Sequence, residues 1–121
     1  MDIYAACQSG NIARVTELLD QGTDVNQLDQ LDHKMIPLIF AIMYNRLEIV
    51  RLLLDRGANI NHRDFTNSTP LQRSIFVDQE FLTDYPHDEN YDEIIKLLVN
   101  RGADINTTNN YNETPLSGLI W

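Results

Sequence analysis

Apolar residues recur along this chain at the three- and four-residue spacing of an α-helix. One such stripe consists of Leu47, Val50, Leu53 and Leu54. Side chains at this spacing lie on one face of a helix, which can then pack against a core. The pattern predicts a series of short helices at residues 3–9, 12–20, 37–44, 47–55, 70–77 and 92–100, with a last helix beginning at residue 115.

Two short motifs recur along the chain and interleave with each other. One places a glycine after a leucine-rich helix, at Gly22, Gly57 and Gly102, in steps of 35 and 45 residues. The other contains a Pro-Leu pair, in Ile36-Pro37-Leu38, Thr69-Pro70-Leu71 and Thr114-Pro115-Leu116, in steps of 33 and 45 residues. Interleaved motifs with a basic period of ~33 residues indicate a stacked-repeat solenoid, an architecture that usually provides binding surfaces.

Local chemistry supports the helix boundaries. Thr69-Pro70-Leu71-Gln72 is a capping box, in which the threonine hydroxyl caps the helix and the glutamine reaches back. Gly57 follows a helix at the place where a left-handed cap is needed. One helix pair cannot bury its apolar stripe alone, so neighbouring units must supply the rest of the core. We expect deep burial of Leu19, Leu38, Ala41, Leu53, Leu71, Leu97 and Leu98.

The glycine segments at 18–26, 53–61 and 98–106, together with the Pro-Leu motifs, resemble the ankyrin repeat. The resemblance implies an all-α, ankyrin-type helix-turn-helix-hairpin solenoid that forms one domain over residues 1–121. Its units are expected at about 1–32, 33–64 and 65–109, with a partial unit at 110–121. Hairpins are expected to project near 22–35, 57–68 and 102–113.

The chain also departs from the family pattern. No unit has the family's histidine after the Pro-Leu pair, and the residues found at this place are Tyr4, Ile39, Gln72 and Ser117. Unit two carries Ile36 where a capping hydroxyl is expected, and Asn45-Arg46 in place of a Gly-His turn. These degenerate units predict moderate stability.

The 45-residue steps reveal an insertion of 12 residues relative to the unit with a 33-residue step. We place it within residues 78–93, a segment with seven acidic residues and no lysine or arginine. Insertions in repeat proteins often lie on the binding face. We therefore include Phe81, Asp84, Tyr85, Asp88 and Glu89 among the candidate partner-binding residues. The alternative is a tolerated surface insertion without a function.

The net charge of −9 argues against general binding to nucleic acid phosphates. The charge is uneven, because residues 46–73 carry five arginines between acidic flanks. Acidic flanks favour a protein partner with a basic patch, although they also serve solubility. No apolar run approaches the ~18 residues of a membrane span, and the start of the chain shows no secretory signal. We therefore expect a cytoplasmic protein, and a monomer, with Cys7 as a buried structural thiol.

The resemblance implies a binding surface formed by the first helices of the units and the hairpin tips. Mapped onto this sequence, that surface is rich in aromatic residues and methionine, which are frequent at interfaces. The candidate residues are Met35, Met43, Tyr44, Phe65, Arg73, Phe76, Tyr111 and Trp121. Phe40 and Arg73 are expected at the edge of the groove. The alternative is that Phe40, Phe76 and Val77 turn inward to the core.

Catalytic and metal-binding patterns are weak. The glycines are isolated, so no glycine-rich phosphate loop exists, and no cofactor is expected. A calcium site could be drawn from Asp84, Asp88, Glu89, Asp92 and Glu93, but these residues lack the spacing of a calcium loop. The three histidines are far apart in the sequence, which disfavours zinc.

We therefore interpret the sequence as a non-enzymatic protein–protein interaction module that uses its groove, hairpin tips and acidic insertion. One alternative is an inhibitor or immunity-type protein that neutralises a basic enzyme or toxin. An enzyme is the alternative from a different class, and it would require a deep pocket with paired carboxylates. The helix expected from residue 115 ends in Leu119-Ile120-Trp121, and we expect it to pack flat on unit three.

Overall fold

The computed structural model describes residues 2–29, 33–75, 89–110 and 114. Within these ranges it contains no strand and six helices, which are α1 (Ile3–Ser9), α2 (Ile12–Asp20), α3 (Pro37–Met43), α4 (Leu47–Asp55), α5 (Pro70–Ile75) and α6 (Glu89–Asn100). The ends predicted for α1, α2 and α4 are confirmed. Helix α3 ends one residue earlier than predicted. Residues 76 and 77 and the helix expected from residue 115 lie outside the described residues.

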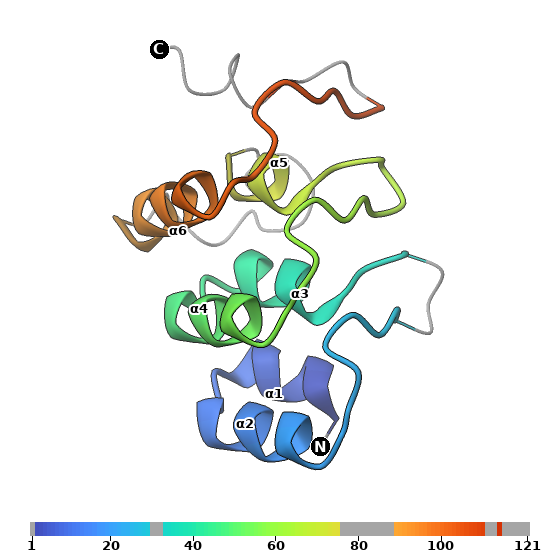
Figure 1. Ribbon diagram of the computed structural model, residues 1–121, viewed down its shortest axis with the longest axis vertical. Coiled ribbons are helices and arrows are strands. Elements are labelled where there is room, and N and C mark those ends of the chain that lie inside the picture. The colour runs from blue at the N-terminus through green and yellow to red at the C-terminus, as the bar shows by residue number, and fades with distance from the viewer. Residues whose placement is uncertain (1, 30–32, 76–88, 111–113, 115–121) are drawn as a thin grey trace.

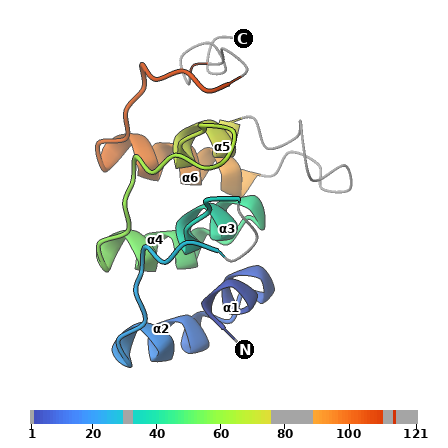
Figure 2. The ribbon, with the colours of Figure 1, turned by 90° about the vertical axis from the view of Figure 1, so that its right-hand side faces the viewer.

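The helices form two layers. Helices α1, α3 and α5 stack on one another, and α2, α4 and α6 stack beside them (Figure 1). Figure 2 shows the two layers side by side. The connecting segments project to one side of the stack, on the right in Figure 1. The predicted all-α solenoid of helix pairs and projecting connections is therefore confirmed.

Polar side chains begin three of the helices. Asp2 accepts a hydrogen bond from the amide of Ala5 (2.9 Å), and Asn11 caps α2 in the same way. The predicted capping box of α5 is present, because the Gln72 amide donates to Thr69 Oγ1 (3.3 Å) and the Thr69 amide donates to Gln72 Oε1 (2.8 Å). Helix α3 begins after Ile36 without a side-chain cap, as its sequence predicts.

The core lies between the layers and between successive units. Five of the predicted core residues are fully buried, namely Leu38, Ala41, Leu53, Leu71 and Leu98. The prediction of deep burial is wrong for Leu19 and Leu97, which are only partly buried against the core. Leu97 lies beside the fully buried Leu98, and the helix directs only one of these two neighbours fully inward. Leu19 and its neighbour Leu18 are both only partly buried, on a helix whose one buried residue is Val15.

Helix α6 begins at Glu89, three residues before its predicted start. Residues 89–91, which we expected in the inserted loop before this helix, therefore belong to the helix. Acidic residues near a helix N-terminus interact favourably with its exposed amides and the helix dipole, which explains why an acidic sequence continues as helix here. Residues 76–88 are outside the described part of the chain.

Asparagines connect the successive hairpins at equivalent positions. Asn26 Oδ1 accepts a hydrogen bond from the Asn59 amide (2.8 Å) one unit later. Asn61 Oδ1 accepts one from the Asp104 amide (2.9 Å) in the following unit. These two bonds occupy the same place in the repeat, so each unit satisfies a backbone donor of the next.

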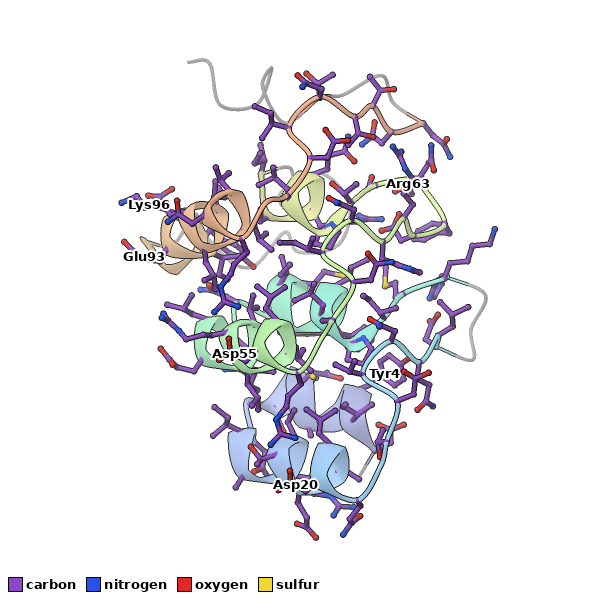
Figure 3. The ribbon with its side chains drawn as sticks, viewed as in Figure 1. Tyr4, Asp20, Asp55, Arg63, Glu93 and Lys96 are labelled. Carbon is purple, nitrogen blue, oxygen red and sulfur yellow. The ribbon has the colours of Figure 1, made fainter. Side chains whose placement is uncertain are left out.

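Ion pairs repeat with the same step at the ends of the second helices. Arg56 donates to Asp20 Oδ1 (2.8 Å), and Arg101 donates to Asp55 Oδ1 (2.7 Å). Figure 3 labels Asp20 on the lowest unit and Asp55 on the unit above it. The pairs are partly exposed, so each contributes little to stability by itself, but both mark how one unit aligns with the next.

Candidate interaction surface

A tight turn at the tip of the 57–68 segment is organised by one aspartate. Asp64 Oδ1 accepts hydrogen bonds from the amides of Thr66 (2.9 Å) and Ser68 (3.1 Å) and from the Thr66 hydroxyl (2.8 Å). The chain turns through Asn67, whose φ of 61° is left-handed. Asparagine tolerates this conformation better than most residues. The turn is therefore fixed by local chemistry.

Arg73 lies beneath this turn. Its Nε donates to Asp64 Oδ2 (2.5 Å), its Nη2 donates to Thr66 Oγ1 (3.0 Å), and the residue is buried. The prediction that Arg73 is exposed at the groove edge is therefore wrong. A guanidinium is expensive to bury without a partner, and the carboxylate nine positions earlier in the chain draws it inward.

Phe65 is the exposed aromatic at this tip, with 40% of its surface accessible. The Arg73 Cζ atom lies 5.6 Å from the centre of its ring, a cation–π contact. The His33 ring lies 5.2 Å away, and the Phe65 amide donates to the His33 carbonyl (2.9 Å). The predicted exposure of Phe65 is confirmed, and its contacts come from the preceding hairpin and from α5.

A row of three aromatic rings follows the first helices. Tyr4 of α1 meets Phe40 of α3 edge to face, with ring centres 5.3 Å apart. Phe40 meets Tyr44 at 5.7 Å. All three are partly buried, so Tyr44 presents less surface than a fully exposed anchor would.

Tyr4 occupies the place of the histidine that the family pattern would have there. Its hydroxyl donates to the Gln27 carbonyl. Burial raises the pKa of this hydroxyl, and the nearby Asp29 and Asp2 carboxylates raise it further. Gln72, at the equivalent place in unit three, donates to the Thr107 carbonyl (2.9 Å). Two different side chains thus make the same link between a first helix and its hairpin.

The two methionines are buried, so their predicted exposure is wrong. Met35 lies at the returning end of its hairpin, where its amide donates to Asp29 Oδ1 (3.1 Å) and its carbonyl accepts from the Asp29 amide (2.9 Å). Met43 ends α3, and its carbonyl accepts from the Tyr91 hydroxyl (3.1 Å) of α6. Both methionine side chains belong to the buried core cluster.

The remaining candidates cannot be placed on this surface. Glu89 is the first residue of α6. The others lie outside the described residues, and they are Phe76, Phe81, Asp84, Tyr85, Asp88, Tyr111 and Trp121. Of the predicted contact residues, the structure therefore brings Phe65 and Tyr44 to the accessible side of the first helices and hairpins.

Sequence reasoning missed Asp64 and Arg63, which support the tip, and assigned Arg73 to the contact surface instead of to this support. Asp64 and Arg73 hold the turn from inside, and Arg63 links it to the next hairpin. The Arg63 guanidinium donates to the carbonyls of Asn67 (3.1 Å) and Thr108 (3.0 Å), and also to the Thr107 hydroxyl. The Asp-x-Thr-x-Ser pattern at 64–68 is a turn signal that could have identified Asp64.

Among the described residues, there is neither a metal-ligand cluster nor a reactive cysteine. Among them, no group of three or more histidine, cysteine, aspartate or glutamate side chains is placed to hold a metal ion. Cys7 is buried, and this burial, aided by Asp2, raises the pKa of its thiol to about 12. A thiol that stays protonated at neutral pH is a poor nucleophile. No helix in the described part of the chain has the length and apolar character needed to cross a membrane.

Comparison with known proteins agrees with the repeated geometry. A family model described as "Ankyrin repeats (3 copies)" matches residues 3–109. The chain is 32% identical over 77 residues to the human "Arf-GAP with coiled-coil, ANK repeat and PH domain-containing protein 2", which covers 64% of this chain and 10% of that protein. It is 42% identical over 71 residues to the "Palmitoyltransferase Hip14" of Drosophila melanogaster, covering 58% of this chain and 11% of that protein.

A viral protein shows a similar match. The "Putative ankyrin repeat protein L371" of Acanthamoeba polyphaga mimivirus is 34% identical over 68 residues, which is 56% of this chain and 9% of that protein. The chain thus spans about a tenth of the length of these curated relatives.

Proposed function

Because the chain belongs to the ankyrin-repeat family, whose repeats generally mediate protein–protein interaction, we propose that it binds a protein partner through its first helices and hairpin tips. Ankyrin domains are typically non-catalytic interaction modules. We place the centre of the contact at Phe65, with the partly buried Tyr44 and Phe40 on the adjoining α3 surface. The finer proposal is a monomeric, cytoplasmic protein that binds a partner with a basic patch.

The observation that carries this proposal is the combination of exposure and support at Phe65. The ring is 40% exposed, yet its backbone is bonded to His33 and its ring contacts Arg73, itself held by Asp64. Exposed aromatic residues with few degrees of freedom lose little entropy on binding. Such residues are common centres of binding energy in protein interfaces.

Substitution of both Tyr44 and Phe65 by alanine tests this surface. If the two are central anchors, affinity for the partner should fall by ~2 kcal/mol or more, which is roughly 30-fold. Ile12→Ala is the matched control, because Ile12 is also an exposed apolar side chain, at 42% accessibility, but lies on the second helix α2, outside the proposed surface. Calorimetry with the partner captured from the source cell gives the affinities. Equal affinities for the wild-type chain and the double variant, with helicity retained, would refute the proposed surface.

The negative charge of this chain favours a partner with a basic surface. The net charge is −9, and residues 74–121 carry nine acidic residues against two basic ones. Complementary charge mainly increases the association rate and makes it sensitive to salt. Asp84→Asn, Asp88→Asn and Glu89→Gln together should therefore slow association at low salt more than they change dissociation. Unchanged association rates would exclude a steering role for the acidic insertion.

A second candidate function is neutralisation of a basic enzyme or toxin by this chain as an inhibitor or immunity-type protein. The same net charge of −9 favours it. The test is whether the captured partner is an enzyme whose activity the full chain suppresses at equimolar concentration. A partner that remains fully active in the complex would reject inhibition while leaving the binding proposal intact.

A further inference from the structure

The outer face of α6, together with the segment that follows it, exposes apolar side chains, whereas the equivalent side chains one unit earlier are partly buried. Val99 is 41% accessible and Ile105 is 39% accessible. Their counterparts one unit earlier, Leu54 and Ile60, are partly buried against the core. Unit three thus keeps apolar residues at these two positions, but their side chains are more exposed than those of unit two.

A third position on this face shows the same difference. Val15 and Val50 are fully buried, whereas Ile95 at the equivalent place is only partly buried. Helix α4 packs on α2, and α6 packs on α4. In the described part of the chain no second-layer helix packs on the far side of α6, which is the uppermost helix of its layer in Figure 1.

The opposite end of the stack is built differently. Arg14 of α2 occupies the position that Ile49 and Ile94 occupy in the next two units, where both isoleucines are buried. Arg14 forms an ion pair with Glu17 (3.1 Å). Solenoids require a polar face on their terminal units. Unit one has such a face, while unit three keeps the apolar positions of an internal unit.

The repeated contacts between units define what would fit on α6. Asp20 and Asp55 each accept an arginine from the following unit, and Asn100 occupies this place in unit three. Asn26 and Asn61 each accept a backbone amide from the following hairpin, and Asn106 occupies that place. A matching unit therefore offers an apolar helix that ends in arginine, followed by an extended segment with a free amide.

We propose that the outer face of α6 docks the second helix and hairpin of an ankyrin-type repeat carried by another protein. Ile95, Val99 and Ile105 supply the apolar contact, and the side-chain oxygens of Asn100 and Asn106 accept the arginine and the hairpin amide. The surface continues the series of interfaces between the units of this chain. Its residues occupy the positions that form those interfaces in the earlier units.

Two other sources of cover fit less well. A second copy, added end to end, would present Arg14 and Gln21 where the site needs isoleucine and arginine. The Thr114-Pro115-Leu116 motif of this chain corresponds to Thr69-Pro70-Leu71, which begins a helix of the other layer. By that equivalence in sequence, a helix beginning at residue 115 is the counterpart of the first helices of the units, whereas the open face belongs to the second-layer helix α6.

Photo-crosslinking of the full chain in its source cell tests this docking face. Val99→p-benzoylphenylalanine places the reactive group on the apolar row, and the same residue at Lys96, 69% exposed on α6, provides a second position. The expected product is a crosslink to the second helix of an ankyrin-type repeat that ends in arginine, identified by mass spectrometry of the joined peptides. The same residue at Arg14 is the control at the opposite end and should give no such product.

Matched variants sharpen the result. Asn100→Asp restores the acid of units one and two and should raise the crosslink yield by roughly twofold, while Asn100→Arg should lower it by a similar factor. Ile105→Asp should reduce the yield by about tenfold, because it places a charge against an apolar surface. Ile12→Ala should leave the yield unchanged, since Ile12 is 42% exposed and begins α2, at the opposite end of the stack.

Several outcomes would overturn the proposal. These are a product with twice the mass of the chain, which indicates a second copy, or a crosslink within one polypeptide. A partner peptide without an ankyrin-type helix would also overturn it. The absence of any product at both positions, with circular dichroism showing a folded chain, would do the same.

Discussion

Replacement of Arg73 by methionine tests how the tip of the 57–68 hairpin is held. The Asp64 side chain is fully buried and the Arg73 side chain is 7% exposed, with 2.5 Å between Nε and Oδ2. Methionine keeps most of the apolar stem but removes the guanidinium. The carboxylate then remains buried without its charged partner, which destabilises a protein by ~3–5 kcal/mol. A domain of this kind has ~5–15 kcal/mol of stability in total, so the loss is a large part of it.

Urea unfolding followed by circular dichroism at 222 nm measures this loss. With an m-value of ~1–3 kcal/mol per molar urea, the midpoint should fall by more than about 1 M. The double variant Asp64→Asn/Arg73→Met is the internal control, because asparagine keeps the side-chain oxygen that accepts the Thr66 and Ser68 amides. Without a buried charge it should be less destabilised than Arg73→Met alone.

Two results would refute this reasoning. A loss below ~1 kcal/mol for Arg73→Met would mean that water or other polar groups replace the guanidinium. Strictly additive effects of the two substitutions would mean that the pair is not energetically coupled. Either result would also weaken the view that Phe65 is supported from beneath.

Further predictions concern the core, the capping box and the thiol. Leu53→Ala should destabilise the chain by ~2–5 kcal/mol in chemical denaturation, because Leu53 is fully buried between units. A loss of stability below half a kcal/mol would show that Leu53 is not packed between units. Gln72→Met should cost ~1–3 kcal/mol, since it removes the partner of the Thr69 amide and of the Thr107 carbonyl, and hydrogen exchange of the Thr69 amide should accelerate. Cys7 should resist thiol reagents in the native state at pH 8 and react only as urea unfolds the chain. Since burial raises its pKa from 9.0 to about 12, the stability from its neutral form is complete below pH 9 and is lost between pH 9 and 12, a loss that Cys7→Ala should lack.

The sequence could predict features that depend on neighbouring residues. The capping box at Thr69 and Gln72 lies within one helical turn, so its two hydrogen bonds follow from residue type and spacing. The repeat step similarly predicted which helices stack, because each unit packs against an equivalent copy of itself. Ile36 was correctly predicted to leave α3 without a side-chain cap.

The surface was harder to predict, because exposure depends on what covers a residue from elsewhere in the chain. Met43 stands at the expected end of a first helix, but Tyr91 of α6 reaches its carbonyl from 48 positions away. Arginine is a common anchor residue in protein interfaces. Arg73, however, forms an ion pair inside the structure with Asp64 of the preceding turn. A single sequence shows the spacing of such residues but not which distant side chain becomes their partner.

The central unit has consequences for how the chain unfolds. It lacks a cap at Ile36 and carries Ile39 where the other units have a polar link to their hairpin. Its hairpin is held instead by Asn26 of unit one, whose side chain bonds the Asn59 amide, and by Arg63, which bonds residues 107 and 108 of unit three. In a linear array, weak intrinsic stability with strong neighbour coupling makes partial unfolding unfavourable. The chain should therefore melt in one cooperative transition, and this middle unit should not fold when transplanted alone.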